Sequence, residues 1–190
     1  MKHARIVLFF ILTAPSLCSS AESMMWQDFA DHFRQPLPAT RISIIKEDQA
    51  SAYALHLLDP ENVEHLSAVA SFHFQLLEFN EAANYYLRLL RIDRTYPGAS
   101  DWFAECLYHA GSIEAAREML EKIDRAGKAS SISLVVLAEI YYRKHDLTSA
   151  IERLERVLKK TEALADNPSY SMLRKYVEHN VNVMRSELKK

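Results

Sequence analysis

Apolar residues recur three and four positions apart along most of the chain, with polar residues between them. This spacing places the apolar side chains on one face of an α-helix. Two such runs alternate, with short polar breaks between them, over residues 63–164. The sequence holds only three glycines and six prolines in 190 residues, which disfavours an all-β fold with many tight turns. The pattern therefore predicts an all-α protein built from antiparallel helix pairs.

Small residues recur at a fixed distance inside these runs. Ala82, Ala116 and Ala150 follow one another at a constant 34-residue spacing. An alanine lets two helix backbones approach closely, and large side chains close over the contact. We therefore expect three helix–turn–helix repeats that pack through their alanines. The same register holds for Ala70, Ala104 and Ala138, for Val69, Phe103 and Leu137, for Tyr86, Leu120 and Leu154, and for Leu89, Ile123 and Val157.

Residues that favour helix starts stand at the polar breaks. Ser112 and Asp146 precede the second run of their repeats, and both are good N-caps. The Asp-Pro pair at 59–60 and the Asn-Pro pair at 167–168 combine a capping side chain with a proline that suits the first helical turn. These pairs predict the start of the first repeat and the start of a last helix.

Further helices are expected outside the repeats. Residues 42–58 predict a helix with Ile45, Ala52, Leu55 and Leu58 on one side. A last helix would cover the end of the array, because a bare terminal repeat exposes apolar surface. Its stripe consists of Leu173, Val177, Val181, Met184 and Leu188, and an upstream stripe of Met25, Trp26, Phe29 and Phe33 fits either a helix docked on the first repeat or a partner-binding arm.

The 34-residue pattern resembles the tetratricopeptide repeat family. The best single match is "LVVLAEIYYRKHDLTSAIERLERVL" at 134–158, and the resemblance covers three repeats over 63–164. Ser100 and His73 depart from it at points that are usually apolar or aromatic, and no proline ends each repeat. The resemblance implies a superhelical solenoid whose concave face is lined by the first helix of each repeat. The expected segments are a signal peptide at 1–21, a helical segment at 22–62, the repeats at 63–164 and a capping helix at 165–190.

Residues 1–21 have the order of a secretory signal peptide. The basic start "MKHAR" precedes the apolar run "IVLFFILTA", which is too short to span a bilayer. Ser19 and Ala21 then give the small-residue spacing of a cleavage site after Ala21. We therefore predict export to the periplasm or another extracytoplasmic space, with a bacterial envelope favoured, and no membrane span after cleavage. An uncleaved anchor and a lipid on Cys18 are the alternatives.

Charge and cysteine content narrow the class of partner. Cleavage removes Lys2 and Arg5, so the mature charge is 21 − 25 = −4. A mildly acidic chain without a basic stripe argues against nucleic acid as a partner. Only Cys106 remains after cleavage, so we expect no internal disulfide.

The sequence carries no motif of catalysis or metal binding. It has no H-E-x-x-H, no G-x-S-x-G and no glycine-rich phosphate loop. Cys106 and His109 could share a helix face, but a nucleophile pair also needs an orienting group and an oxyanion site. We therefore expect no enzyme activity, no cofactor and no metal, and a small enzyme that uses this pair stays as an alternative.

The first helix of each repeat supplies the predicted partner-binding residues. Their aromatic column, in the 34-residue register, is typical of the anchors of an interface. Some family members clamp acidic C-terminal peptides with basic residues, whereas three of the six corresponding points here are acidic and none is basic. An acidic and aromatic groove predicts a protein partner with apolar and basic segments. The predicted residues are Ser67, Ser71, Phe74, Asp101, Glu105, Tyr108, Val135, Glu139 and Tyr142.

These observations predict a non-catalytic interaction protein of the cell envelope, which acts as a scaffold, an assembly factor or a chaperone. A second possibility is a structural subunit of a larger envelope or secretion complex, in which the convex and end surfaces carry the contacts.

Overall fold

The computed structural model describes residues 37–165 and 167–190 of the chain. Over these residues the secondary structure is helical, with no strand, which confirms the all-α class. The chain divides into two compact units, and the boundary falls within one helix: one unit is Arg34–Ile140 and the other includes Tyr141–Lys190. The predicted signal peptide and the stripe at 25–33 lie outside the described residues.

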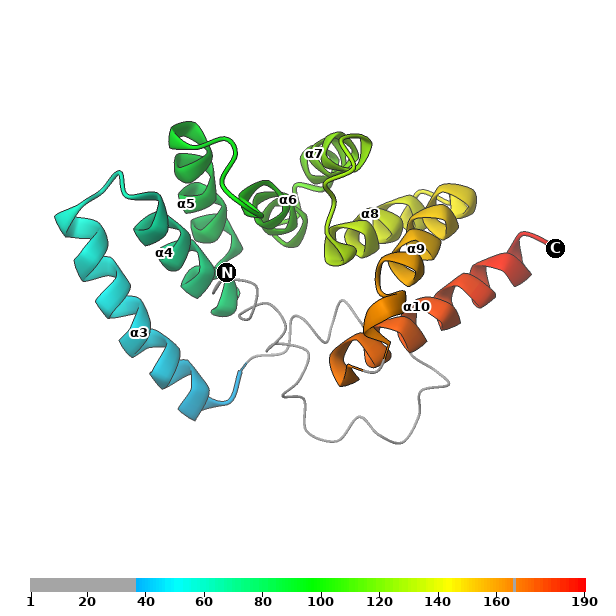
Figure 1. The fold of residues 1–190 in the computed structure, drawn as a ribbon, viewed down its shortest axis with the longest axis horizontal. Helices are drawn as coiled ribbons and strands as arrows, with labels where there is room; N and C mark the ends of the chain where they lie inside the picture. The colour runs from blue at the N-terminus through cyan, green and yellow to red at the C-terminus, as the bar shows by residue number, and fades with distance from the viewer. Residues whose placement is uncertain (1–36, 166) are drawn as a thin grey trace. The chain divides into compact units, whose positions relative to one another are not determined.

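The helices follow one another with short connections (Figure 1). In the unit Arg34–Ile140, α3 packs on α4, α4 on α5, α5 on α6, and α6 on α7. The second helices of the expected repeats begin at Phe79, Ile113 and Leu147, which keep the 34-residue spacing. The bounds are α3 Ala39–Leu58, α4 Val63–Gln75, α5 Phe79–Ile92, α6 Ala99–His109, α7 Ile113–Arg125, α8 Ser131–Arg143, α9 Leu147–Lys160, a 3-10 turn at Glu162–Leu164, and α10 Pro168–Glu187.

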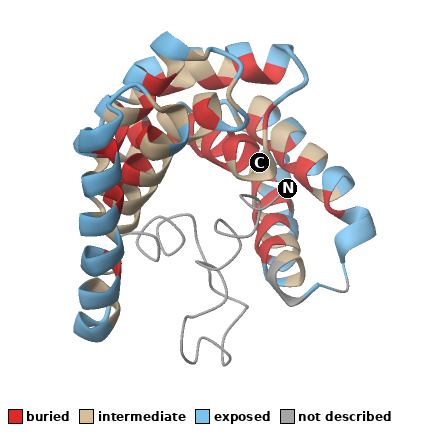
Figure 2. Ribbon diagram, turned by 60° about the vertical axis from the view of Figure 1, so that its left-hand side comes forward, coloured by how far each residue is buried: buried red, intermediate tan, exposed pale blue. Residues whose placement is uncertain are grey.

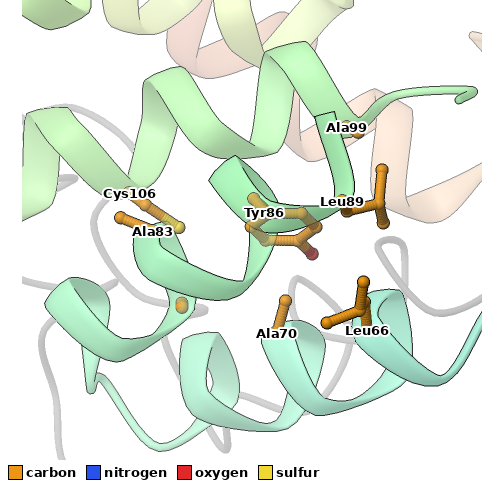
Figure 3. Packing of buried hydrophobic residues seen from close by; sticks show 8 residues of the cluster. Leu66, Ala70, Ala83, Tyr86, Leu89, Ala99 and Cys106 are labelled. Carbon is orange, nitrogen blue, oxygen red and sulfur yellow. The ribbon is translucent and has the colours of Figure 1, made fainter. Parts of the chain in front are cut away.

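The alanines of the repeat register lie in the core, as predicted. Between α4, α5 and α6 the core cluster includes Leu66, Ala70, Tyr86 and Leu89, which Figure 3 shows gathered between the helices. In Figure 2 the buried residues lie where neighbouring helices face one another. The small residues therefore mark helix contacts. The fully buried alanines of the register are Ala82, Ala116 and Ala150 on the second helices and Ala70, Ala104 and Ala138 on the first.

The turn inside each repeat has the same backbone geometry. Leu77, Gly111 and His145 occupy one position of the 34-residue register, and all three have positive φ, at 61°, 87° and 60°. In each turn the following residue donates its backbone N–H to a carbonyl five residues earlier, as in Glu78 to His73. This is the hydrogen-bond pattern of a Schellman motif, which ends a helix through a left-handed residue.

Two of the predicted helix starts need correction. Asp146 caps α9 as predicted, because its carboxylate accepts the N–H of Ser149 at 3.0 Å. Ser112 makes no such bond at α7. Helix α4 begins later than the 59–60 pair suggests, because Asn62 is its N-cap and accepts the N–H groups of Glu64 and His65.

The outer face of α3 also differs from the prediction. Ile45 and Ala52 are buried, but Leu55 and Leu58 are 50% and 83% exposed. The inward position belongs to His56, whose ring packs edge-on against Tyr85 of α5 with centroids 5.6 Å apart. The contact face of α3 therefore carries the His56 ring, which packs on Tyr85 of α5, and Leu55 and Leu58 face outward.

In the other unit, α10 packs against α9. Leu173, Val177, Val181 and Met184 are buried as predicted, whereas Leu188 is exposed. Arg174 donates to the carbonyl of Leu158 at 2.6 Å, Arg185 pairs with Glu155, and both contacts join α10 to α9. A cation at a helix C-terminus satisfies carbonyls that have no partner within the helix.

Candidate partner-binding surface

The nine predicted binding residues form three columns in the repeat register. Eight of them lie on α4, α6 and α8 within the unit Arg34–Ile140, and Tyr142 lies beyond its end. The columns are Ser67, Asp101 and Val135; Ser71, Glu105 and Glu139; and Phe74, Tyr108 and Tyr142.

Exposure changes along these columns from one helix to the next. On α4 all three predicted side chains are partly exposed. On α6, Asp101 is partly exposed, but Glu105 is 4% and Tyr108 is 2% exposed. On α8, Val135 and Glu139 are buried, as is every residue from 133 to 140. The expectation of an open acidic face is therefore wrong for Glu105 and Glu139, because α6 and α8 are buried on more sides than α4.

Phe74 joins three helices of the repeat region. Its ring lies 5.4 Å from that of Phe79 on α5 and 5.2 Å from that of Trp102 on α6, both edge-on. Such pairs add to the stability that area burial gives. Trp102 also packs against the core cluster, close in sequence to Ser100, where an apolar side chain is expected and missing. Phe74 therefore packs internally and keeps only part of its ring for a partner.

Ser71 is tied to the protein on both sides. Its hydroxyl donates to the carbonyl of Ser67 at 2.8 Å and lies 3.2 Å from the hydroxyl of Tyr86. Burial raises the pKa of Tyr86, so this phenol stays protonated at any physiological pH. The hydroxyl of Ser71 on α4 is thus fixed by a backbone carbonyl of its own helix and by the buried Tyr86.

Asp101 organises the start of α8. Its carboxylate accepts the backbone N–H of Ser130 at 2.9 Å and the hydroxyl of Ser133 at 2.6 Å. The hydroxyl of Ser130 in turn accepts the N–H of Ser133 at 3.0 Å, which is the bond of a helix N-cap. An acid at this position also suits the positive end of the helix dipole. Asp101 therefore has a structural role that sequence reasoning missed, although the serines ahead of the apolar run signal a cap.

Glu105 lies beside this network as a second acid. Its carboxyl is 3.4 Å from the hydroxyl of Ser133, which already donates to Asp101. Burial first, and the charge of Asp101 second, raise the pKa of Glu105 to about 8. Glu105 is therefore mostly protonated at neutral pH and adds little negative charge to the surface.

Cys106 and His109 point into different surroundings. Cys106 is fully buried in the core cluster, where Figure 3 shows it near Ala83. Burial raises the pKa of the Cys106 thiol, so the thiolate that a nucleophile needs is disfavoured. The His109 ring instead stacks on Phe79, with centroids 4.7 Å apart. This geometry does not make the pair that the enzyme hypothesis requires.

His73 explains one departure from the repeat pattern. Its Nδ1 lies 2.6 Å from the carboxylate of Glu78, and its Nε2 lies 2.6 Å from the hydroxyl of Tyr53 on α3. Tyr85 stacks on the His73 ring and donates to the Tyr53 hydroxyl. A polar ring replaces the usual apolar residue because α3 offers it a hydrogen-bond partner. In the sequence, the only sign of this role is that a histidine stands at a position that is usually apolar or aromatic.

Two features of the described residues bear on other classes of function. No group of three or more His, Cys, Asp or Glu side chains among them could hold a metal ion. None of the helices in the part of the chain that the structure describes is long and apolar enough to cross a membrane.

Solved structures of two bacterial repeat proteins share this fold. The type III secretion chaperone SycD of Yersinia enterocolitica, solved with a peptide of the translocator YopD, is similar at a TM-score of 0.56 and 17% identity, over 65% of this chain and 92% of that chain. A structure of MamA is similar at a TM-score of 0.58 and 17% identity, over 86% of this chain and 92% of that chain. Another MamA structure is similar at a TM-score of 0.56 and 15% identity, over 88% of this chain and 99% of that chain.

The sequence itself also matches a known family. Residues 75–132 match a family described as Tetratricopeptide repeat. No curated protein matches the chain. The matched segment runs from the end of α4 to the start of α8 and contains the buried alanines of the central repeat. Residues 75–132 are therefore a tetratricopeptide-repeat segment, as the alanine register predicts, and the described helices share the fold of these solved structures.

Proposed function

We propose that this protein is a non-catalytic interaction module that binds a segment of a partner protein on the exposed face of α4 and the adjoining edge of α6. One observation carries the proposal. Leu66, Val69 and Ala70 turn one face of α4 into the core, while Ser67 and Phe74 on the other face stay partly exposed in the repeat register. Because one face of α4 is buried and the other is partly exposed, the second face remains available to a partner.

The chemistry of this face suggests the class of partner. Phe74 and Trp102 are partly buried aromatic rings on neighbouring helices, 5.2 Å apart, and Asp101 is a partly exposed acid on α6. Aromatic residues are enriched among interface hot spots. A segment with an apolar anchor and a basic side chain would complement them. The structure of SycD with a translocator peptide supports the idea that this fold can hold a peptide segment.

Site-specific crosslinking tests the proposal. A photoreactive phenylalanine would replace Ser67 on α4 in one variant and Asn84, an exposed residue of α5, in the control. Both proteins would be irradiated with the native cell extract, and the crosslinked partner would be identified by mass spectrometry. We expect a discrete product from position 67 and none from position 84.

The same experiment separates the proposal from the structural-subunit alternative. In that case exposed positions on second helices, such as Asn84 and Glu118 on α7, would crosslink as well as Ser67 or better. That outcome would replace the proposed binding face with the opposite side of the repeats.

We further propose that the chain is exported and that the mature protein begins at Glu22. The support is the basic, apolar and small-residue order of residues 1–21. Intact-mass measurement of the protein purified from cells tests this proposal. Loss of residues 1–21 is the expected result. A full-length mass, or a mass with acyl chains on Cys18, contradicts it.

A further inference from the structure

The contact between α3 and the first repeat contains a buried histidine, and neither of its ring nitrogens faces a hydrogen-bond acceptor that could stabilise a second proton. His56 of α3 is 6% exposed and faces Tyr85 and Arg88 of α5. Its Nε2 is 3.5 Å from Nη1 of Arg88, and the ring of Tyr85 packs edge-on against it. Its Nδ1 is buried and has no hydrogen-bond partner.

The geometry fixes which nitrogen of His56 is free to take a proton. A guanidinium has only N–H donors, so the ring nitrogen that faces Arg88 must be the one with a lone pair. A proton on Nε2 would set two donors, both positively charged, against each other at 3.5 Å. The proton on Nδ1 finds no acceptor that could compensate.

Arg88, which is itself exposed, makes two further contacts beside His56. Its second nitrogen, Nη2, donates to the carbonyl of Pro60 at 3.4 Å, and its guanidinium lies over the ring of Tyr85 at 5.5 Å. Both contacts lie at the junction of α5 with the end of α3 and favour the position of the guanidinium beside His56.

The other titratable groups around this contact do not offset the charge of a protonated His56. From α4, His65 adds a further positive influence when it is protonated. The charges of Glu78 and Glu81 reach Tyr53 of the same contact, and Glu78 is bonded to His73. Beyond α3, Asp59 accepts a hydrogen bond from the side chain of Asn62. Burial first, and then the charge of Arg88, lower the pKa of His56 below its ordinary value.

We propose that His56 makes the docking of α3 pH-dependent, so that α3 leaves the first repeat when this ring takes up a proton. The sign follows from linkage. A histidine whose pKa is lower in the docked state than in the free helix favours docking fully above about pH 6.5. That contribution is lost as the pH falls from there toward the lower pKa of the docked ring. Release of α3 would uncover the buried side of α4 and Tyr85 at mildly acidic pH.

Hydrogen–deuterium exchange of the full chain tests the proposal. Exchange of peptides from α3 would be followed between pH 8 and pH 5, with peptides from α7 as the internal reference and rates corrected for intrinsic pH dependence. In the wild type we expect the opening of α3 relative to α7 to increase below about pH 6.5, by up to about tenfold for each pH unit, which is the limit for one proton.

Three variants identify the group that titrates. His56→Gln keeps a polar side chain that does not titrate, and the extra opening of α3 at low pH should disappear. His179→Gln, on α10, is the matched control and should keep the wild-type response. His73→Gln should weaken docking at every pH but keep the increase below about pH 6.5, because its loss removes hydrogen bonds and not the charge beside Arg88.

A second measurement keeps the test decisive if a variant undocks α3 at all pH values. The ring resonances of His56 can be titrated by NMR in the wild-type protein and in Arg88→Gln. We expect a pKa below about 6.5 in the wild type and a higher pKa without the arginine. A wild-type pKa that is not lowered from about 6.5, or a low-pH response that persists in His56→Gln, overturns the proposal.

Discussion

Glu105 places a buried carboxyl group beside a second acid, and this makes the stability of the repeat depend on pH. Its pKa is raised from 4.5 to about 8 in the folded protein, first by burial and then by Asp101. A carboxyl group with a raised pKa stabilises the fold fully below its unfolded pKa, and this contribution is lost as the pH rises toward the folded value. Glu105 therefore disfavours folding increasingly between pH 4.5 and about pH 8.

Replacing Glu105 with Gln should remove this dependence. The amide keeps the shape and the polar contact with Ser133 but has no proton to release. We expect the stability difference between Glu105→Gln and the wild type to grow with pH, by at most about 1.4 kcal/mol per pH unit, in favour of the variant. Urea unfolding at pH 5, 6.5 and 8 gives the comparison. A difference that does not change with pH would contradict the assignment.

The repeat register predicted where each side chain lies on its helix better than it predicted how exposed that side chain is. Ser71, Glu105 and Glu139 occupy one column of the repeat, yet only Ser71 is partly exposed. A repeat fixes which direction a side chain takes, whereas its burial depends on what the neighbouring helix brings against it. At Glu105 that neighbour is Ser133, from a helix whose start is organised by Asp101. Such local partners carry no signal in a 34-residue spacing.

At the scale of the helix, adjacent alanines on α7 separate core from surface. Ala116 is fully buried in the repeat register, and Ala115 beside it is exposed. Ala116→Leu should force bulk into a closed helix contact and cost about 1–3 kcal/mol. Ala115→Leu makes the same chemical change and should alter the stability little. Chemical denaturation of both variants measures the difference, and equal stabilities would mean that the helix contact is elsewhere.

In the turns, substitutions at two equivalent positions should change the stability in opposite directions. Gly111 and His145 share a left-handed backbone, but only glycine adopts it without strain. His145 is exposed, so His145→Gly should relieve this strain and stabilise the protein by about 1 kcal/mol. Gly111→Ala should destabilise it by a similar amount, although no atom lies within 4 Å of the added methyl group. Thermal unfolding of both variants would show whether the shifts have opposite signs.

Helices and their contacts were largely predictable because periodicity and alanine spacing are written in the sequence. The positions of the helix ends were less predictable. Asn62 caps α4 three residues after the Asp that opens the Asp-Pro pair, and Ser112 makes no capping bond. Capping depends on the side-chain rotamer and on the direction in which the preceding loop enters, and neither follows from residue type alone.

At the scale of the molecule, the contact of α3 with the first repeat combines the buried apolar residues Ile45 and Ala52 with a cluster of polar rings. Its large residues Leu57 and Leu58 face outward, and its junction with the repeat is made through Tyr53, His56 and His73. Hydrogen bonds and a titratable ring are more sensitive to conditions than hydrophobic burial is. The helices α4, α5 and α6, in contrast, are joined through buried alanines and leucines. The sequence predicted this contact only in part: Ile45 and Ala52 are buried as expected, whereas Leu55 and Leu58 are exposed and His56 lies at the contact.

The proposed binding face can be tested through charge without disturbing the fold. Ser67 is partly exposed on α4, and Asn84 is exposed on α5. Ser67→Lys and Asn84→Lys add the same charge, and neither charge is buried, so both should leave the protein folded. Ser67→Lys also removes a side-chain hydrogen bond to Tyr96. If the partner presents basic residues to the face that contains Asp101, Ser67→Lys should slow association by about tenfold at low salt. Added salt should reduce this effect, since screening weakens it. Association rates of the crosslinked partner with the wild type and both variants provide the measurement, with circular dichroism as the check on folding. A larger loss for Asn84→Lys would move the binding surface to the second helices of the repeats.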